Sequence, residues 1–172
     1  MSIFRKPLGT YTRSTPDWFY TDTAAGFGFC GNPGPGSEPA VGLYNNATDG
    51  RTLFVFGIGG NGAGNEVLNV SFFNGPGFQL TDPAACYAID PTQGQPIGQI
   101  WRGLTATQAA TPPVINQQGL YILGESTASA DAPIDKIMSE HPLAVIRPGF
   151  MLAGWTFADV VSMWFQYVVM RF

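Results

Sequence analysis

From Pro39 onward, short apolar runs alternate with clusters of turn-forming residues. The clearest pattern is in EVLNVSFF (66–73), where apolar residues at every second position face one way and Asn69 and Ser71 face the other. Such alternation predicts a strand with one solvated face. Further strands are expected in AVGLY (40–44), RTLFVFGI (51–58), IGQIWRGL (97–104), LYILG (120–124) and FMLAGWTF (150–157).

The cluster NNATDG lies between the runs 40–44 and 51–58. Two apolar runs separated by a short polar cluster of this kind are typical of a β-hairpin. We therefore expect these two strands to pair with each other.

The C-terminal run VVSMWFQYVVMRF (160–172) admits two interpretations. Part of it fits a helical stripe, but other apolar residues fall off that stripe. Its content of β-branched and aromatic residues favours a strand. In a strand, Val161, Met163, Phe165, Tyr167 and Val169 would share one pleat face.

One segment has a helical pattern, DAPIDKIMSEH (131–141), in which Pro133 follows Asp131 at the expected start. Together the runs predict an all-β fold, a β-sandwich or jelly-roll-like barrel with at most this one short helix. The apolar stretch 149–170 is not expected to cross a membrane, because it contains Asp159.

Residues 1–38 differ from the rest of the chain. The stretch GFGFCGNPGPGSEP (26–39) is so rich in Gly and Pro that neither helix nor regular strand is expected to persist. We expect an extended Gly/Pro-rich N-terminal arm over 1–38 and a β-sandwich domain over 39–172. The arm would dock on its own body or on a neighbouring subunit through Phe4, Arg5, Lys6, Tyr11, Arg13, Trp18, Phe19 and Tyr20.

The composition points to a covered surface. Charged residues make up 12% of the chain and aromatic residues 13%, with a net charge of −4. An ordinary soluble domain has about 25% charged residues, and interface cores are depleted in charge and enriched in aromatics. We expect protein partners rather than direct nucleic-acid contact, since the arm has few basic residues. Cys30 and Cys86 are expected to be buried thiols.

The segment GIGGNGAGN (57–65) has the glycine spacing of a dinucleotide-binding loop. That loop must be followed by a helix whose N-terminus meets the phosphates. Here the alternating run 66–73 follows instead. We therefore interpret the glycines as a connection between two strands and expect no cofactor.

No other segment indicates catalysis. The single histidine, His141, and two distant cysteines are too few for a typical zinc site, so no metal is expected. A Ser/His/Asp triad need not be adjacent in sequence, so a small hydrolase on a jelly-roll scaffold stays open as the third hypothesis. The favoured interpretation is that the protein is not an enzyme.

Two stretches resemble structural proteins of tailed bacteriophages. VGLYNNATDGRTLFVFGI (41–58) resembles a pair of strands common in their small β-sandwiches, and IRPGFMLAGWTFADVVSMWFQYVVMRF (146–172) resembles the end of such domains. At the terminus Phe172 stands where an acidic residue is usual. The resemblance implies a virion component, with a capsid decoration (cement), tail, collar or fibre-base protein as candidates.

The first hypothesis is therefore a non-enzymatic virion subunit, a cement protein that stabilises the shell through its arm and sandwich. Its partners would be the major capsid protein or neighbouring copies, and we expect a homo-oligomer, a trimer. The alternative is a tail- or fibre-associated carbohydrate- or receptor-binding module. Such a module would use exposed Trp and Tyr in the long loops between 75 and 118.

Overall fold

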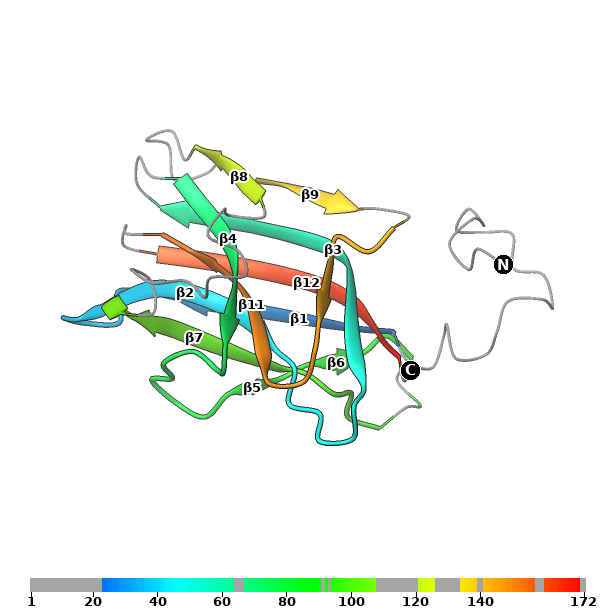
Figure 1. The fold of residues 1–172 in the computed structure, drawn as a ribbon. Coiled ribbons are helices and arrows are strands. Elements are labelled where there is room, and N and C mark those ends of the chain that lie inside the picture. The colour runs from blue at the N-terminus through cyan, green and yellow to red at the C-terminus, as the bar shows by residue number, and fades with distance from the viewer. Residues whose placement is uncertain are drawn as a thin grey trace.

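The protein is a sandwich of two antiparallel sheets (Figure 1). The computed structural model describes residues 23–63, 67–90, 92, 94–107, 121–125, 134–138, 141–156 and 160–170. In sheet A the strand order is β10 (Ala144–Ile146), β3 (Thr52–Ala63), β12 (Val160–Met170), β1 (Thr23–Cys30) and β6 (Tyr87–Ala88), and β9 (Ile134–Met138) also pairs with β3. In sheet B the order is β5 (Ala84–Ala85), β7 (Gln99–Thr105), β2 (Ser37–Tyr44), β11 (Phe150–Trp155), β4 (Val67–Asn74) and β8 (Tyr121–Glu125). The all-β sandwich prediction is confirmed.

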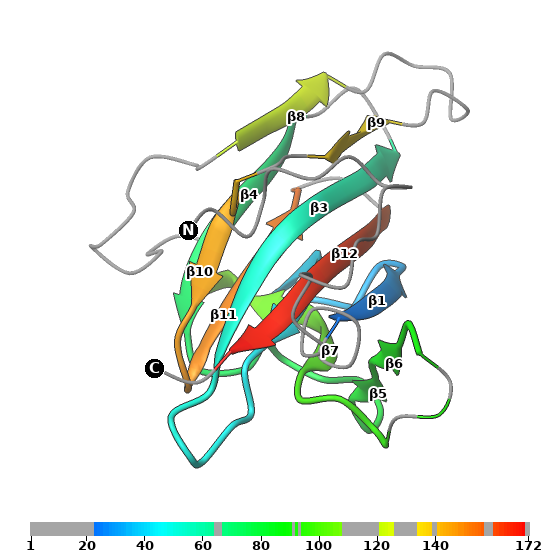
Figure 2. The ribbon, with the colours of Figure 1, turned by 90° about the vertical axis from the view of Figure 1, so that its right-hand side faces the viewer.

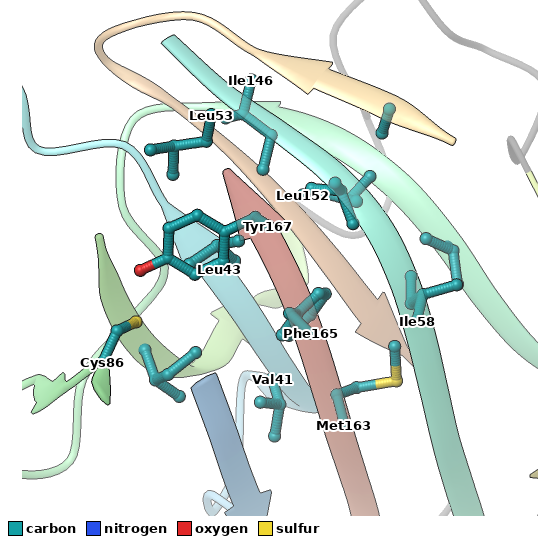
Figure 3. Packing of buried hydrophobic residues seen from close by; sticks show 14 of the residues in the cluster. Val41, Leu43, Leu53, Ile58, Cys86, Ile146, Leu152, Met163, Phe165 and Tyr167 are labelled. Atoms are coloured by element: carbon teal, nitrogen blue, oxygen red, sulfur yellow. The ribbon is translucent and has the colours of Figure 1, made fainter. Parts of the chain in front are cut away.

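Strand β12 is central to sheet A and confirms the strand interpretation of the C-terminal run. It pairs with β1 along one side and with β3 along the other. The five side chains predicted to share one pleat face point into the space between the sheets and are at most 8% exposed. Figure 3 shows three of them, Met163, Phe165 and Tyr167, packed against Val41 and Leu43 of β2.

The outer face of sheet B is also apolar. Ser71 and Phe73 of β4 are buried, so the expectation of a solvated face on this strand is wrong. The segment after β4 lies against this face, since a Cβ at Gly77 would be 3.3 Å from the Met151 methyl carbon. The second buried cluster contains Ala40, Phe73, Leu104, Met151, Ala153 and Trp155.

Strands β2 and β3 lie in different sheets, so the hairpin prediction is wrong. The loop between them crosses from sheet B to sheet A at one end of the sandwich. Asn45, fully buried, holds this crossing: its Nδ2 donates to the Arg51 carbonyl at 2.9 Å and to the Ile146 carbonyl at 2.8 Å, and its Oδ1 accepts from the Ala47 N–H at 3.0 Å. Asn45 thus links the two sheets, which a turn between two strands of one sheet would not do.

Gly57, Gly59, Gly60 and Gly62 are inside strand β3, so their prediction as a loop between strands is wrong. They pair with β12, and Gly60 lies opposite Met163. A Cβ at Gly60 would be only 2.8 Å from the Ser162 carbonyl oxygen and would meet the Met163 sulfur. Gly60 therefore makes room for β12.

Two further expectations are corrected. Residues 134–138, placed in the predicted short helix 131–141, form strand β9 on the edge of β3. Residues 23–30 form strand β1, although a regular strand was not expected in 26–39, and the boundary placed after residue 38 falls inside β2. Pairing with neighbours overrides the weak local propensity in both cases.

Candidate protein interface

The predicted arm residues Phe4, Arg5, Lys6, Tyr11, Arg13, Trp18, Phe19 and Tyr20 lie outside the described residues. The docking role of the arm stays a prediction. The candidate site described below comes from the body of the sandwich.

One side of the sandwich is built by strands from both sheets. β5 pairs with β7 in sheet B and β6 pairs with β1 in sheet A, and only Cys86 separates β5 from β6. The chain therefore crosses between the sheets at this side, where β1 packs over β7. Figure 2 shows β1, β5, β6 and β7 gathered at the right of the molecule.

Large apolar side chains are exposed on this side. Phe27 and Phe29 of β1 are 59% and 55% exposed, and Tyr87 of β6 is 71% exposed. Of the large hydrophobic residues exposed in the described part of the chain, only Val145, on β10 at the opposite edge of sheet A, lies elsewhere. We call the group on this side the apolar edge; it consists of Phe27, Phe29, Phe78, Leu80, Tyr87 and Ile89.

The glycines of β1 explain why its phenylalanines point outward. A Cβ at Gly26 would be 2.6 Å from Cδ1 of Ile100, and one at Gly28 would be 2.5 Å from Cγ1 of Val41. The space facing sheet B therefore admits no side chain at these positions. Because residues alternate across a strand, Phe27 and Phe29 must lie on the outer face.

The apolar edge was missed from the sequence, although a signal was present. The stretch Gly26-Phe27-Gly28-Phe29 has the period of two that indicates a strand. Counting its glycines and prolines together favoured a loop, whereas the alternation of small and large residues predicts one tightly packed face and one aromatic face.

Charge is absent from β1 and β6, which carry the exposed aromatic residues, and from three other strands of the same sheet. None of β1, β3, β6, β10 and β12 contains Asp, Glu, Lys or Arg. Charged residues close to the apolar edge lie around it, with Asp82 and Asp90 in the segments beside β5 and β6, and Arg102 on β7. An apolar centre with a polar rim is the usual anatomy of a protein interface.

The Cys86 thiol and the Tyr167 hydroxyl lie in the core below the apolar edge, where the chain crosses from β5 to β6. Tyr167 donates to the Ile97 carbonyl at 2.7 Å. Desolvation raises the pKa of Cys86 to about 11, even though its hydrogen bond with Tyr167 acts in the opposite direction, and desolvation also raises the pKa of Tyr167. The thiol is therefore protonated at neutral pH and is not a nucleophile. Cys30 and Cys86 are both buried and unpaired, as predicted.

The other residues considered for chemistry are dispersed. His141 is exposed between β9 and β10, where the predicted helix end is not found. Among the described residues, no three His, Cys, Asp or Glu side chains come close enough together to hold a metal ion. None of the described helical segments has the length and apolar character needed to cross a bilayer.

The apolar edge is therefore the candidate interaction surface of the described residues. Comparison with known proteins adds no assignment: no protein-family model, curated protein or solved structure matches this chain.

Proposed function

We propose that the protein is a non-enzymatic structural subunit that binds other protein chains through the apolar edge. The observation that carries the proposal is that three exposed aromatic side chains, Phe27, Phe29 and Tyr87, share the outer face of sheet A, because Ala25 of β1 pairs with Tyr87 of β6. Isolated exposed hydrophobic residues are normal, but a contiguous patch on a soluble protein marks an interaction site.

The size of the patch supports an interface. Phe27, Phe29 and Tyr87 are each more than half exposed, and aromatic side chains of about 200 Å² each then present roughly 350 Å² in total. At about 25 cal/mol per Å², covering this area contributes roughly 9 kcal/mol before the cost of association is subtracted. Leu80 and Ile89 extend the patch further.

We place this subunit in a phage-like particle, as a capsid decoration protein. The resemblance of 41–58 and 146–172 to phage structural proteins supports this finer proposal, as does the low charge of the chain. The partners would be the major capsid protein or neighbouring copies, with the N-terminal arm as a second contact. The trimer expected from the sequence is not part of this proposal.

The test uses particles purified from the source of the protein, with cross-linking and mass spectrometry to find the neighbours of Tyr87. Cross-links from this side to another chain are expected, and Tyr87→Lys should reduce incorporation. Val145→Lys is the matched control, because Val145 is also an exposed hydrophobic residue of sheet A. Absence of the protein from particles would refute the placement, and normal incorporation of Tyr87→Lys would refute the role of the apolar edge.

A carbohydrate- or receptor-binding module remains the second candidate, because Tyr87 is a highly exposed aromatic residue within 75–118. Trp101 supports it less, since it is half-buried, packs edge-on against Tyr44 and donates to Gln99. Binding on a glycan array that is lost in Tyr87→Ala would favour this module over a structural subunit.

A further inference from the structure

Strand β1 is paired along only part of one side. β12 pairs with all eight of its residues from Thr23 to Cys30, without a register shift. On the other side β6 pairs only with Ala24 and Ala25. No described segment pairs with the stretch from Gly26 to Cys30 on that side.

The backbone groups on the open side belong to the two exposed phenylalanines. The Ile89 N–H donates to the Thr23 carbonyl at 3.0 Å, so Thr23 directs its polar groups toward the β6 side. Backbone groups alternate along a strand. The N–H and C=O of Phe27 and Phe29 therefore also point to the open side, beyond the end of β6.

The edge of β7 in sheet B, unlike the edge of β1, is covered by another segment of the chain. β5 pairs with only two residues of β7, but the next free N–H, that of Arg102, donates to Oε1 of Gln79 at 3.0 Å. The segment carrying Gln79 thus covers the edge of β7. An open apolar edge like that of β1 is a ready template for another strand.

We infer that the open edge of β1 pairs with β1 of a second copy of this chain, antiparallel, about a two-fold axis at Gly28. This inference deepens the proposed function and rests on it, because it names one partner of the apolar edge. Phe27 of one copy then lies opposite Phe29 of the other, and both pairs exchange N–H···O=C bonds. Four hydrogen bonds form, and the four phenyl rings meet on one face of a continuous sheet.

The register follows from the lengths of the elements. With the axis at Gly28, Gly26 of each copy faces Cys30 of the other, and β1 ends there. The chain then turns toward β2 through Gly34 and Gly36, which have φ of 95° and 79°, so the strand of the second copy stops before it reaches β6. With the axis at Phe27, Phe29 would face Ala25, which β6 already occupies.

The absence of charge also favours a second copy. A two-fold interface brings each patch against itself, so any charge near the axis would meet a like charge. No residue of β1 or β12 is charged. Sequence and topology thus permit self-association without a repulsive contact at the centre.

The experiment measures the mass of the full-length protein by sedimentation equilibrium over a range of concentrations. Wild type is expected to be a dimer, and Phe27→Lys/Phe29→Lys is expected to lose the dimer while keeping the β-sheet circular dichroism of wild type. Val145→Lys should remain a dimer. Hydrogen exchange gives a second readout: the amides of Phe27 and Phe29 should be protected in wild type and exchange rapidly in the double variant.

Three results would overturn the inference: a monomeric wild type, a dimer that survives the double substitution, or a dimer lost on deletion of residues 1–20 but not on the double substitution. The last would make the arm, and not the β1 edge, the contact between the two copies. A wild-type monomer that still incorporates into particles through Tyr87 would leave the proposed function standing while the β1 pairing fails.

Discussion

Replacing Asn45 by alanine tests how the two sheets are joined. Asn45 is fully buried, and its side chain makes three hydrogen bonds, to Arg51, Ile146 and Ala47. Ile146 ends β10 in sheet A, whereas the Asn45 backbone N–H donates to Phe150 of β11 in sheet B. The substitution removes the amide, leaves the two carbonyls without their donor and leaves the Ala47 N–H without its acceptor.

The expected cost follows from those carbonyls. A buried polar group deprived of its partner costs about 1–3 kcal/mol. With two such groups and some entry of water at the loop, we expect a loss of about 3 kcal/mol in the free energy of unfolding. For a chain of this size that corresponds to a fall of roughly 6–12 °C in melting temperature.

The assay is urea denaturation followed by circular dichroism, at one fixed protein concentration because association would change the apparent stability. Asn46→Ala is the matched control: the Asn46 residue is exposed and its side chain accepts one hydrogen bond, from the Gly98 N–H at 2.9 Å. It should cost about 0.5–1 kcal/mol. If Asn45→Ala costs no more than Asn46→Ala, the buried amide does not hold the crossing and the reasoning is refuted.

Three further predictions concern the core. Gly60→Ala should destabilise by about 1–3 kcal/mol, because its Cβ would lie 2.8 Å from the Ser162 carbonyl oxygen, whereas Gly94→Ala, with open space around it, should be within about 0.5 kcal/mol of wild type in the same urea assay. Tyr167→Phe should lower the unfolding free energy by about 1 kcal/mol, because the Ile97 carbonyl loses its donor and the Cys86 thiol loses its partner; an unchanged denaturation midpoint would contradict it. The thiol of Cys86 ionises near 9 when unfolded and near 11 when folded, so stability should fall as pH rises between these values, and less steeply in Cys86→Ala.

The sequence could predict strands where one face of a strand is buried against the opposite sheet. In β12 every second residue from Val161 to Val169 enters the core, so composition and pleat period agree. Strands β7, β8 and β11 were predicted because apolar runs bounded by turn residues recur there.

Pairing partners could not be predicted, because the local chemistry of a turn is the same in a hairpin and in a crossing between sheets. The cluster NNATDG is compatible with a hairpin and with a crossing between sheets. The role of the buried Asn45 amide depends on its hydrogen bond to the Ile146 carbonyl, which is distant in sequence. The glycines of β3 likewise have low strand propensity by themselves. At Gly60 the explanation lies on the neighbouring strand, where Met163 and the Ser162 carbonyl oxygen leave no room for a Cβ. The interface was predicted in the arm, which lies outside the described residues. The apolar edge was not predicted, because the many Gly and Pro residues of 26–39 favoured a loop where β1 is found.

The position of β12 has a consequence for synthesis of the protein. This strand lies between β1 and β3, and it is the last strand of the described chain to leave the ribosome. Until it emerges, two apolar strands made much earlier have no partner between them, so the centre of sheet A must assemble after translation of the rest. During that interval β1 and β3 expose backbone groups that β12 of a neighbouring chain can satisfy, so β12 is the element that a domain-swapped dimer would exchange.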